Sequence, residues 1–167
     1  MIARPRTYAP LLASLVVIAD QITKRWATTD LLRAGGHMAM PGPVDFTLSL
    51  NQSNAFGLTP IIGHATRWFL MGANLVVAAI ILYVLIARRV RPLTGYGLAL
   101  VMAGAIGNAL DRLFVGAAVD FFDASKIGFV WIFNLADTAI DLGIVLILLG
   151  SLKDPHRGAP KASAEGR

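Results

Sequence analysis

Cysteine is absent from this 167-residue sequence, and charged residues make up only 15% of it. Without cysteine the chain can form no disulfide bond, thiolate metal site or thiol nucleophile. A hydrophobic fraction of 56% excludes a disordered chain, and with so little charge it argues against an ordinary soluble domain. Several long apolar segments then indicate an integral membrane protein, and the length favours a single domain.

The sequence motifs of several enzyme classes are also missing. There is no Gly-rich phosphate loop and no HExxH zinc motif. The histidines His37, His64 and His156 have no spacing that suggests a metal site or a catalytic triad, so we expect them to be solvated. We therefore predict no metal site and no cofactor.

The net charge of +5 restricts the possible partners. In a soluble protein a basic surface would suggest nucleic acid. Here most basic residues adjoin apolar segments, which anionic lipid headgroups explain more simply. We predict membrane lipids as partners and no nucleic acid.

Four apolar segments predict an all-α membrane protein with four transmembrane helices. The first could instead be a signal peptide, but no small-residue cleavage site follows it. Residues 1–152 are expected to form one membrane domain, and residues 153–167 a disordered cytoplasmic tail. The expected spans are about 8–27, 67–87, 93–111 and 133–152.

Residues 28–65 form a polar connection, rich in glycine and proline, that is too long for a tight turn. Within it, Asp45 to Leu50 alternates polar and apolar residues, which predicts a short strand or hairpin. This would be a small extracytoplasmic β element between the first two helices. The segment that begins at Asn51 is rich in turn-forming residues, and it could equally bind a substrate.

Basic residues are distributed unevenly between the two sides of the predicted membrane domain. Nine lie at the two ends of the chain and within residues 88–91, whereas six are spread over the longer connections of the other side. The positive-inside rule then places both termini in the cytoplasm. Trp26, Trp68 and Trp131 would lie at the outer interface, as an aromatic belt does.

Four of the nine aspartates lie between residues 107 and 137, beside apolar segments. Carboxylates are costly there, so they mark a candidate functional site. The repeated pattern Asn108-x-x-Asp111 and Asn134-x-x-Asp137 places an amide beside a carboxylate on one helix face. Two neighbouring carboxylates share one proton, so the ionised one can activate water while the protonated one polarises a carbonyl. A proton or cation path is the alternative that these residues leave open.

These motifs resemble those of lipoprotein signal peptidase, the signal peptidase II family. The resemblance implies an intramembrane aspartyl protease with four transmembrane helices in the bacterial inner membrane. Its substrates would be prolipoproteins, cut before a diacylglyceryl-modified cysteine. The matching segments, within residues 8–152, are Asp20-Gln-Ile-Thr-Lys24, Asn51…Ala55-Phe56, Gly107-Asn108-Ala-Leu-Asp111-Arg112, Val119-Asp120-Phe121 and Phe133-Asn134-Leu-Ala136-Asp137.

The resemblance implies that Asp120 and Asp137 are the catalytic dyad. Around them it implies support from Asn108, Asp111, Arg112 and Asn134, and, further out, from Asp20, Lys24 and Asn51. One departure concerns Ser53 and Asn54, which stand where the family usually has glycine and a small residue. Because glycine adopts positive φ without strain, this departure concerns the geometry of the substrate loop.

The neighbours of each aspartate give further expectations. Asp111 precedes Arg112, so we expect its charge to be neutralised locally. Asp120 stands between apolar residues, where a raised pKa is expected. We expect Asp123 to face solvent and Asp141 to be structural.

A non-enzymatic transporter or scaffold is the competing class. Transporters place broken helices at mid-membrane, whereas these motifs lie at helix ends, which suits an enzyme that uses water. Nothing in the sequence indicates an oligomer, and we expect a monomer.

Overall fold

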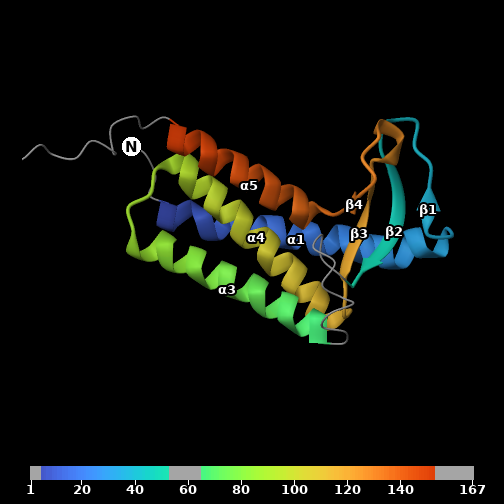
Figure 1. The fold of residues 1–167 in the computed structure, drawn as a ribbon, viewed down its shortest axis with the longest axis horizontal. Coiled ribbons are helices and arrows are strands. Elements are labelled where there is room, and N and C mark those ends of the chain that lie inside the picture. The colour runs from blue at the N-terminus through green and yellow to red at the C-terminus, as the bar shows by residue number, and fades with distance from the viewer. Residues whose placement is uncertain (1–4, 53–64, 153–167) are drawn as a thin grey trace, which may run out of the picture.

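The computed structural model describes residues 5–52 and 65–152. Four helices run alongside one another, and a small sheet stands at one end of them (Figure 1). The predicted features at Ser53, Asn54 and residues 153–167 lie outside the described residues. Each of the four segments predicted as helical overlaps one of these helices, although α1, α3 and α4 extend beyond the predicted bounds: α1 (Pro5–Trp26), α3 (Thr66–Ala87), α4 (Pro92–Phe114) and α5 (Leu135–Leu152).

Three of the described helices, α3, α4 and α5, are long and apolar enough to cross a membrane. Helix α1 is as long as α3 but is not among them. Its second half carries Asp20, Lys24 and Arg25, and it continues into a π-helical turn, Ala27–Leu31. Helix α4 contacts each of the other three helices and forms the centre of the bundle.

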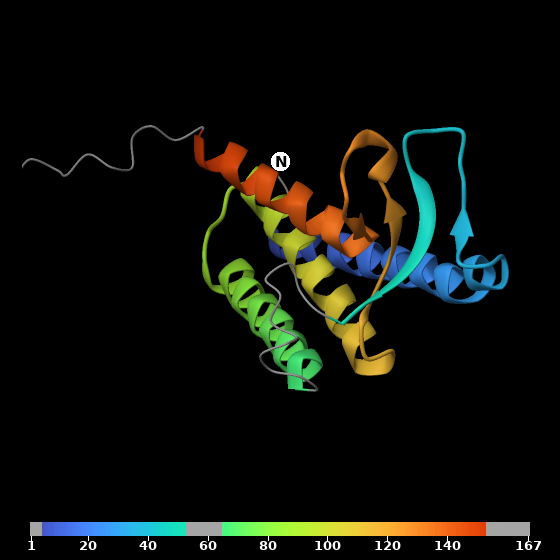
Figure 2. The same cartoon turned by 45° about the vertical axis from the view of Figure 1, so that its right-hand side comes forward.

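The sheet is antiparallel, with the strand order β1, β2, β3, β4. Strand β2 pairs with β3 through a bulge between Phe46 and Ser49, and Ser49 lies opposite Asp120. Figure 2 shows the sheet at the end of the bundle where α1 ends and α5 begins. The strands are β1 (His37–Met38), β2 (Asp45–Asn51), β3 (Ala118–Asp123) and β4 (Ile132–Phe133).

The prediction of a β element between the first two helices was correct for β1 and β2 but incomplete. Strands β3 and β4 come from the connection between α4 and α5, which the sequence did not identify as β structure. Residues 118–121 are all buried, so β3 lacks the alternation of polar and apolar residues that identified β2. Strand β4 has only two residues, too few to form a pattern.

Aromatic packing fixes the sheet against the end of α1. The ring of Phe121 is almost fully buried and lies against Trp26 of α1, with Phe46 and Phe122 beside it. On the other side of β3, α4 ends at Phe114 and the chain turns at Gly116, whose φ of +89° favours glycine. Strand β3 is thereby held against the bundle, where it brings Asp120 toward the start of α5.

Candidate active site

Asp120 projects from the buried part of β3 and is only 2% exposed. Its Oδ1 accepts a hydrogen bond from Asn134 Nδ2 at 2.6 Å, and its Oδ2 accepts one from Asn51 Nδ2 at 3.0 Å. Burial raises the pKa of Asp120 to about 6, and the charge of Asp137 adds to the rise, while the two amide bonds oppose it. The raised pKa expected from its apolar neighbours is confirmed.

Asp137 lies in the first turn of α5, where Asn134 caps the helix. The Asn134 Oδ1 accepts a hydrogen bond from the Asp137 backbone N at 2.9 Å, and Asp137 Oδ2 accepts one from the Asn134 backbone N at 3.3 Å. This reciprocal pair is a capping box, built here from an asparagine and an aspartate. The cap fixes the Asp137 side chain at the positive end of the helix dipole.

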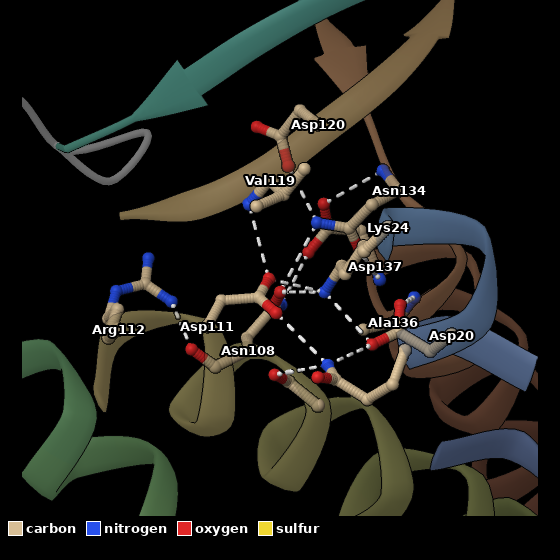
Figure 3. Close-up of polar contacts among 12 residues, drawn as sticks. Asp20, Lys24, Asn108, Asp111, Arg112, Val119, Asp120, Asn134, Ala136 and Asp137 are labelled. Atoms are coloured by element: carbon tan, nitrogen blue, oxygen red, sulfur yellow. Dashed lines mark hydrogen bonds and ion pairs between the residues drawn. The ribbon is translucent and has the colours of Figure 1, made fainter. Parts of the chain in front are cut away.

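Asn108 of α4 connects the two aspartates to the rest of the site. Its Nδ2 donates to Asp137 Oδ1 at 2.8 Å, and its Oδ1 accepts from Asn134 Nδ2 at 3.2 Å and from Lys24 Nζ at 3.1 Å. Figure 3 shows these bonds running from Asp120 through Asn134 and Asn108 to Lys24. One turn further along α4, the buried Arg112 donates from Nη1 to the Asn108 carbonyl oxygen at 3.1 Å.

Arg112 was expected to neutralise Asp111, but it is not the ion-pair partner of Asp111. Asp111 instead forms an ion pair with Lys24 of α1, with Nζ and Oδ2 2.6 Å apart. Lys24 also pairs with Asp20 at 3.0 Å, as their spacing of four residues on one helix allows. Sequence neighbours on a helix point in different directions, so the partner of Asp111 came from another helix.

Asn51 was expected to lie further out than the residues around the dyad, and this was also wrong. Its direct hydrogen bond to Asp120 places it in contact with the predicted dyad. It stands at the end of β2, opposite Ala118 of β3, so strand pairing brings it to the site. Asp20 and Lys24 do lie further out, since they contact Asn108, Asp111 and the α5 backbone rather than the side chains of Asp120 and Asp137.

The two aspartates line one cavity of about 830 Å³. Its polar lining includes Asn51, Asn108 and Arg112, so it brings together residues from β2 and α4 with the dyad. The rest of its wall is mainly apolar and comes from the segment before α5 and from the outward face of α5. Sequence reasoning missed this part of the site, to which Ile127, Phe129, Trp131, Phe133, Leu142 and Val145 belong.

Asp123 has a structural role beyond the solvent-facing position expected of it, and Asp141 was expected to be structural. Asp123 is partly buried and accepts hydrogen bonds from Thr47 Oγ1 at 2.7 Å and from the Ser125 backbone N at 3.0 Å, so it is structural. Asp141 is exposed and lines the cavity one helical turn after Asp137. Across the described residues, no group of three or more histidine, aspartate or glutamate side chains is placed to hold a metal ion.

The family model described as signal peptidase (SPase) II matches residues 12–153. The chain belongs to the signal peptidase II family. Family membership makes it a protease and decides against the transporter or scaffold alternative. With its apolar helices, it also makes the chain a bacterial multi-pass membrane protein.

Relatives of the signal peptidase II family match most of the chain. The lipoprotein signal peptidase of Caulobacter vibrioides is 39% identical over 152 residues, covering 90% of this chain and 89% of the relative. That of Staphylococcus aureus is 31% identical over 145 residues, covering 86% and 87%. A solved structure described as a bacterial membrane enzyme has a TM-score of 0.75 and 30% identity, and covers 92% of both chains.

Proposed function

We propose that this chain is an aspartyl endopeptidase that removes signal peptides from bacterial prolipoproteins. It hydrolyses the peptide bond before a diacylglyceryl-modified cysteine. The observation that carries the proposal is the pair Asp120 and Asp137, which reach one cavity from a strand and a helix and are joined by Asn134. Its relatives are named lipoprotein signal peptidases, and its family is one of proteases.

The two aspartates have different surroundings, which suit different roles. Asp120 is buried, and its pKa of about 6 favours the protonated form more than in a solvated aspartate. Asp137 accepts hydrogen bonds from Asn108 and from the Asn134 backbone at the positive end of α5, so it suits the negative charge of the pair. Asp120 is thus the general acid, and Asp137 the general base, of the first step.

The reaction then needs only a water molecule and the shared proton. Asp137 takes a proton from water as the water oxygen attacks the carbonyl carbon, and Asp120 gives its proton to the carbonyl oxygen. The gem-diol breaks when Asp137 gives its proton to the amide nitrogen and Asp120 takes one from a hydroxyl group. The C–N bond is cleaved, and both aspartates return to their starting protonation.

The apolar wall of the cavity supports a lipid-modified substrate. Phe129, Trp131 and Leu142 lie on the same cavity as the dyad, and all three are about half exposed. Burial of acyl methylenes contributes about 0.8 kcal/mol each, which would hold the modified cysteine at the membrane interface. The peptide before the cysteine would meet the polar part of the cavity, where Asn51 and Arg112 lie.

We further propose that all four helices span the inner membrane, with both termini in the cytoplasm and the dyad at the outer face. The start of α1 and the end of α5 lie at the end of the bundle opposite the sheet (Figure 1). The basic residues within 88–91, in the connection from α3 to α4, support a cytoplasmic position for that end. Both aspartates come from one chain, so a monomer can act alone.

A comparison of two peptides tests the substrate assignment. One carries the diacylglyceryl cysteine and the other has the same sequence with an unmodified cysteine. At matched concentration in detergent, we expect the lipidated peptide to be cleaved and its twin to be nearly inert, because a bare backbone loses hydrogen bonds with water on entering the site. Equal rates would exclude the lipid as the anchor.

A further inference from the structure

Two buried carboxylates have no role in the chemical steps above. Asp20 of α1 and Asp111 of α4 are 0% and 3% exposed, and Lys24 lies between them, also 3% exposed. Buried charges are costly, and replacing such a group by apolar side chains is often neutral or stabilising. Stability alone therefore explains this cluster poorly, and its contacts indicate another role.

Asp111 holds the backbone directly before Asp120. Its Oδ2 accepts a hydrogen bond from the Val119 backbone N at 3.1 Å. Between the two residues the chain leaves α4, turns at Gly116 and enters β3. The contact therefore fixes the start of β3 relative to the last turn of α4.

Asp20 does the same for the other aspartate. Its Oδ1 accepts a hydrogen bond from the Ala136 backbone N at 2.9 Å, and Ala136 directly precedes Asp137. Ala136 is the second residue of α5, where a backbone N–H has no partner within the helix. A carboxylate from α1 thus supplies the acceptor that completes the cap of α5.

Two side chains of α1 join these carboxylates. Lys24 Nζ lies 3.0 Å from Asp20 Oδ2 and 2.6 Å from Asp111 Oδ2. Gln21 Nε2 donates to the same two side chains, at 3.2 Å to Asp20 Oδ2 and 3.0 Å to Asp111 Oδ1. The backbone N–H groups of Val119 and Ala136 are therefore linked to each other through the carboxylates of Asp111 and Asp20, which Lys24 and Gln21 of α1 join.

We propose that Asp20, Lys24 and Asp111 form a brace that sets the position of Asp120 relative to Asp137. The three are positioning residues, since they contact backbone, one another, Gln21 and Asn108 rather than the reacting atoms. A misplacement of about 1 Å in a catalytic group can cost about 100-fold in rate, so such a brace acts on turnover. The proposal rests on the assignment of Asp120 and Asp137 as the dyad.

Matched substitutions at Asp111 separate the hydrogen bond from the charge. Asp111→Asn keeps an oxygen that can accept the Val119 N–H, whereas Asp111→Leu has a similar volume and no acceptor. We expect kcat of the leucine variant to fall about 100-fold with KM of the lipidated peptide within about twofold, and the asparagine variant to stay within about fivefold of the parent. Asp30→Asn, on an exposed surface pair, is the control.

The same pair of substitutions at Asp20 tests the other arm of the brace. An equal loss of kcat in the asparagine and leucine variants, an effect on KM alone, or parental kcat in the leucine variants would overturn the brace. So would leucine variants that fail to fold while both asparagine variants cleave normally, because the carboxylates would then serve folding only. Asp120→Asn is assayed alongside. If Asp120→Asn stays active, the dyad assignment fails. If Asp120→Asn is inactive but the leucine variants at Asp20 and Asp111 stay active, the brace alone fails.

Discussion

At the scale of a single residue, the side-chain amide of Asn134 connects the two carboxylates of this site. Its Oδ1 accepts the backbone N–H of Asp137, while its Nδ2 donates to Asp120 and Asn108. An aspartate at this position would keep the helix cap but lose both donated bonds, and it would add a negative charge beside Asp120. The amide of Asn134 satisfies the helix end and a carboxylate at once.

The raised pKa of Asp120 predicts an unusual dependence of stability on pH. The pKa of Asp120 is about 6 in the folded protein and 3.8 in an ordinary solvated aspartate, so the folded protein binds more protons between these pH values than the unfolded chain does. The contribution of Asp120 is therefore complete below about pH 4 and is lost as the pH rises through 6. The loss in the free energy of unfolding is at most about 3 kcal/mol, because one pKa unit corresponds to about 1.4 kcal/mol.

Thermal unfolding in detergent from pH 4 to pH 7 measures this effect, with Asp120→Asn as the reference because its amide does not titrate. We expect the parent to lose stability relative to the variant as the pH rises. A difference that stays constant, or one that grows in favour of the parent, would contradict the burial of this carboxyl group.

At the scale of elements, glycines bring α4 and α5 into backbone contact. A Cβ on Gly97 would lie 2.6 Å from the Gly143 carbonyl oxygen, and one on Gly143 would lie 2.6 Å from the Gly97 carbonyl oxygen. This reciprocal contact leaves no room for a side chain at position 97 of α4 or at position 143 of α5. The close packing keeps Asn108 of α4 beside Asp137 of α5.

Alanine substitutions at two helical glycines test this packing. In Gly97→Ala the new methyl group meets Gly143 and Ile147, so the helices must separate, at a cost of about 1–3 kcal/mol. Gly72 of α3 has no heavy atom within 4 Å of its added Cβ, so Gly72→Ala gains up to about 1 kcal/mol of helix propensity. We expect the first change to lower the unfolding temperature and the second not to. Equal changes in the unfolding temperatures of the two variants would contradict the packing role of Gly97.

The elements differ in how far the sequence could predict them. The helices were predictable because their apolar length is a property of consecutive residues. Strand β2 was predictable because polar and apolar residues alternate along it, whereas the first four residues of β3 are all buried and show no such alternation. The joining of β2 and β3 in one sheet depends on pairing between residues about 70 positions apart, for which the sequence carries no local signal.

The site shows the same division. The repeated Asn-x-x-Asp pattern identified Asp111 and Asp137, and the apolar neighbours of Asp120 indicated its raised pKa. The partner of Asp111 was not predictable, because Lys24 comes from another helix, 87 positions away. Nor was the cavity role of Asp141, since its exposure depends on which face of α5 the sheet and α4 leave uncovered.

At the scale of the whole molecule, the polar parts gather at one end of an apolar bundle. The sheet lies at that end and the connection from α3 to α4 at the other (Figure 1). Asp120 on β3 and Asp137 in the first turn of α5 line the cavity at the sheet end. If this end lies at the membrane surface, a water molecule from the solvent and a membrane-held substrate can both reach it. This arrangement agrees with a protease that acts on a lipid-anchored peptide.

The absence of native cysteine allows a direct test of orientation. Ser125, in the short 3-10 helix between β3 and β4, and Ser151, near the end of α5, are both exposed. The sheet and the end of α5 lie at opposite ends of the molecule (Figure 1). In intact cells we expect a membrane-impermeant thiol reagent to label Ser125→Cys and to label Ser151→Cys only after permeabilisation. The cysteine-free parent is the control for background, and the reverse pattern would place the dyad on the cytoplasmic side.

The dyad is the central claim, and cleavage of a lipidated prolipoprotein peptide by the purified Asp120→Asn and Asp137→Asn variants tests it most directly. An amide is nearly isosteric with a carboxyl group, but it can neither take the proton from water, as Asp137 does, nor give a proton to the carbonyl oxygen, as Asp120 does. We expect both variants to insert and fold as the parent does and to have no measurable turnover, while Asp30→Asn cleaves at the parental rate. Near-parental cleavage by either dyad variant would contradict the account.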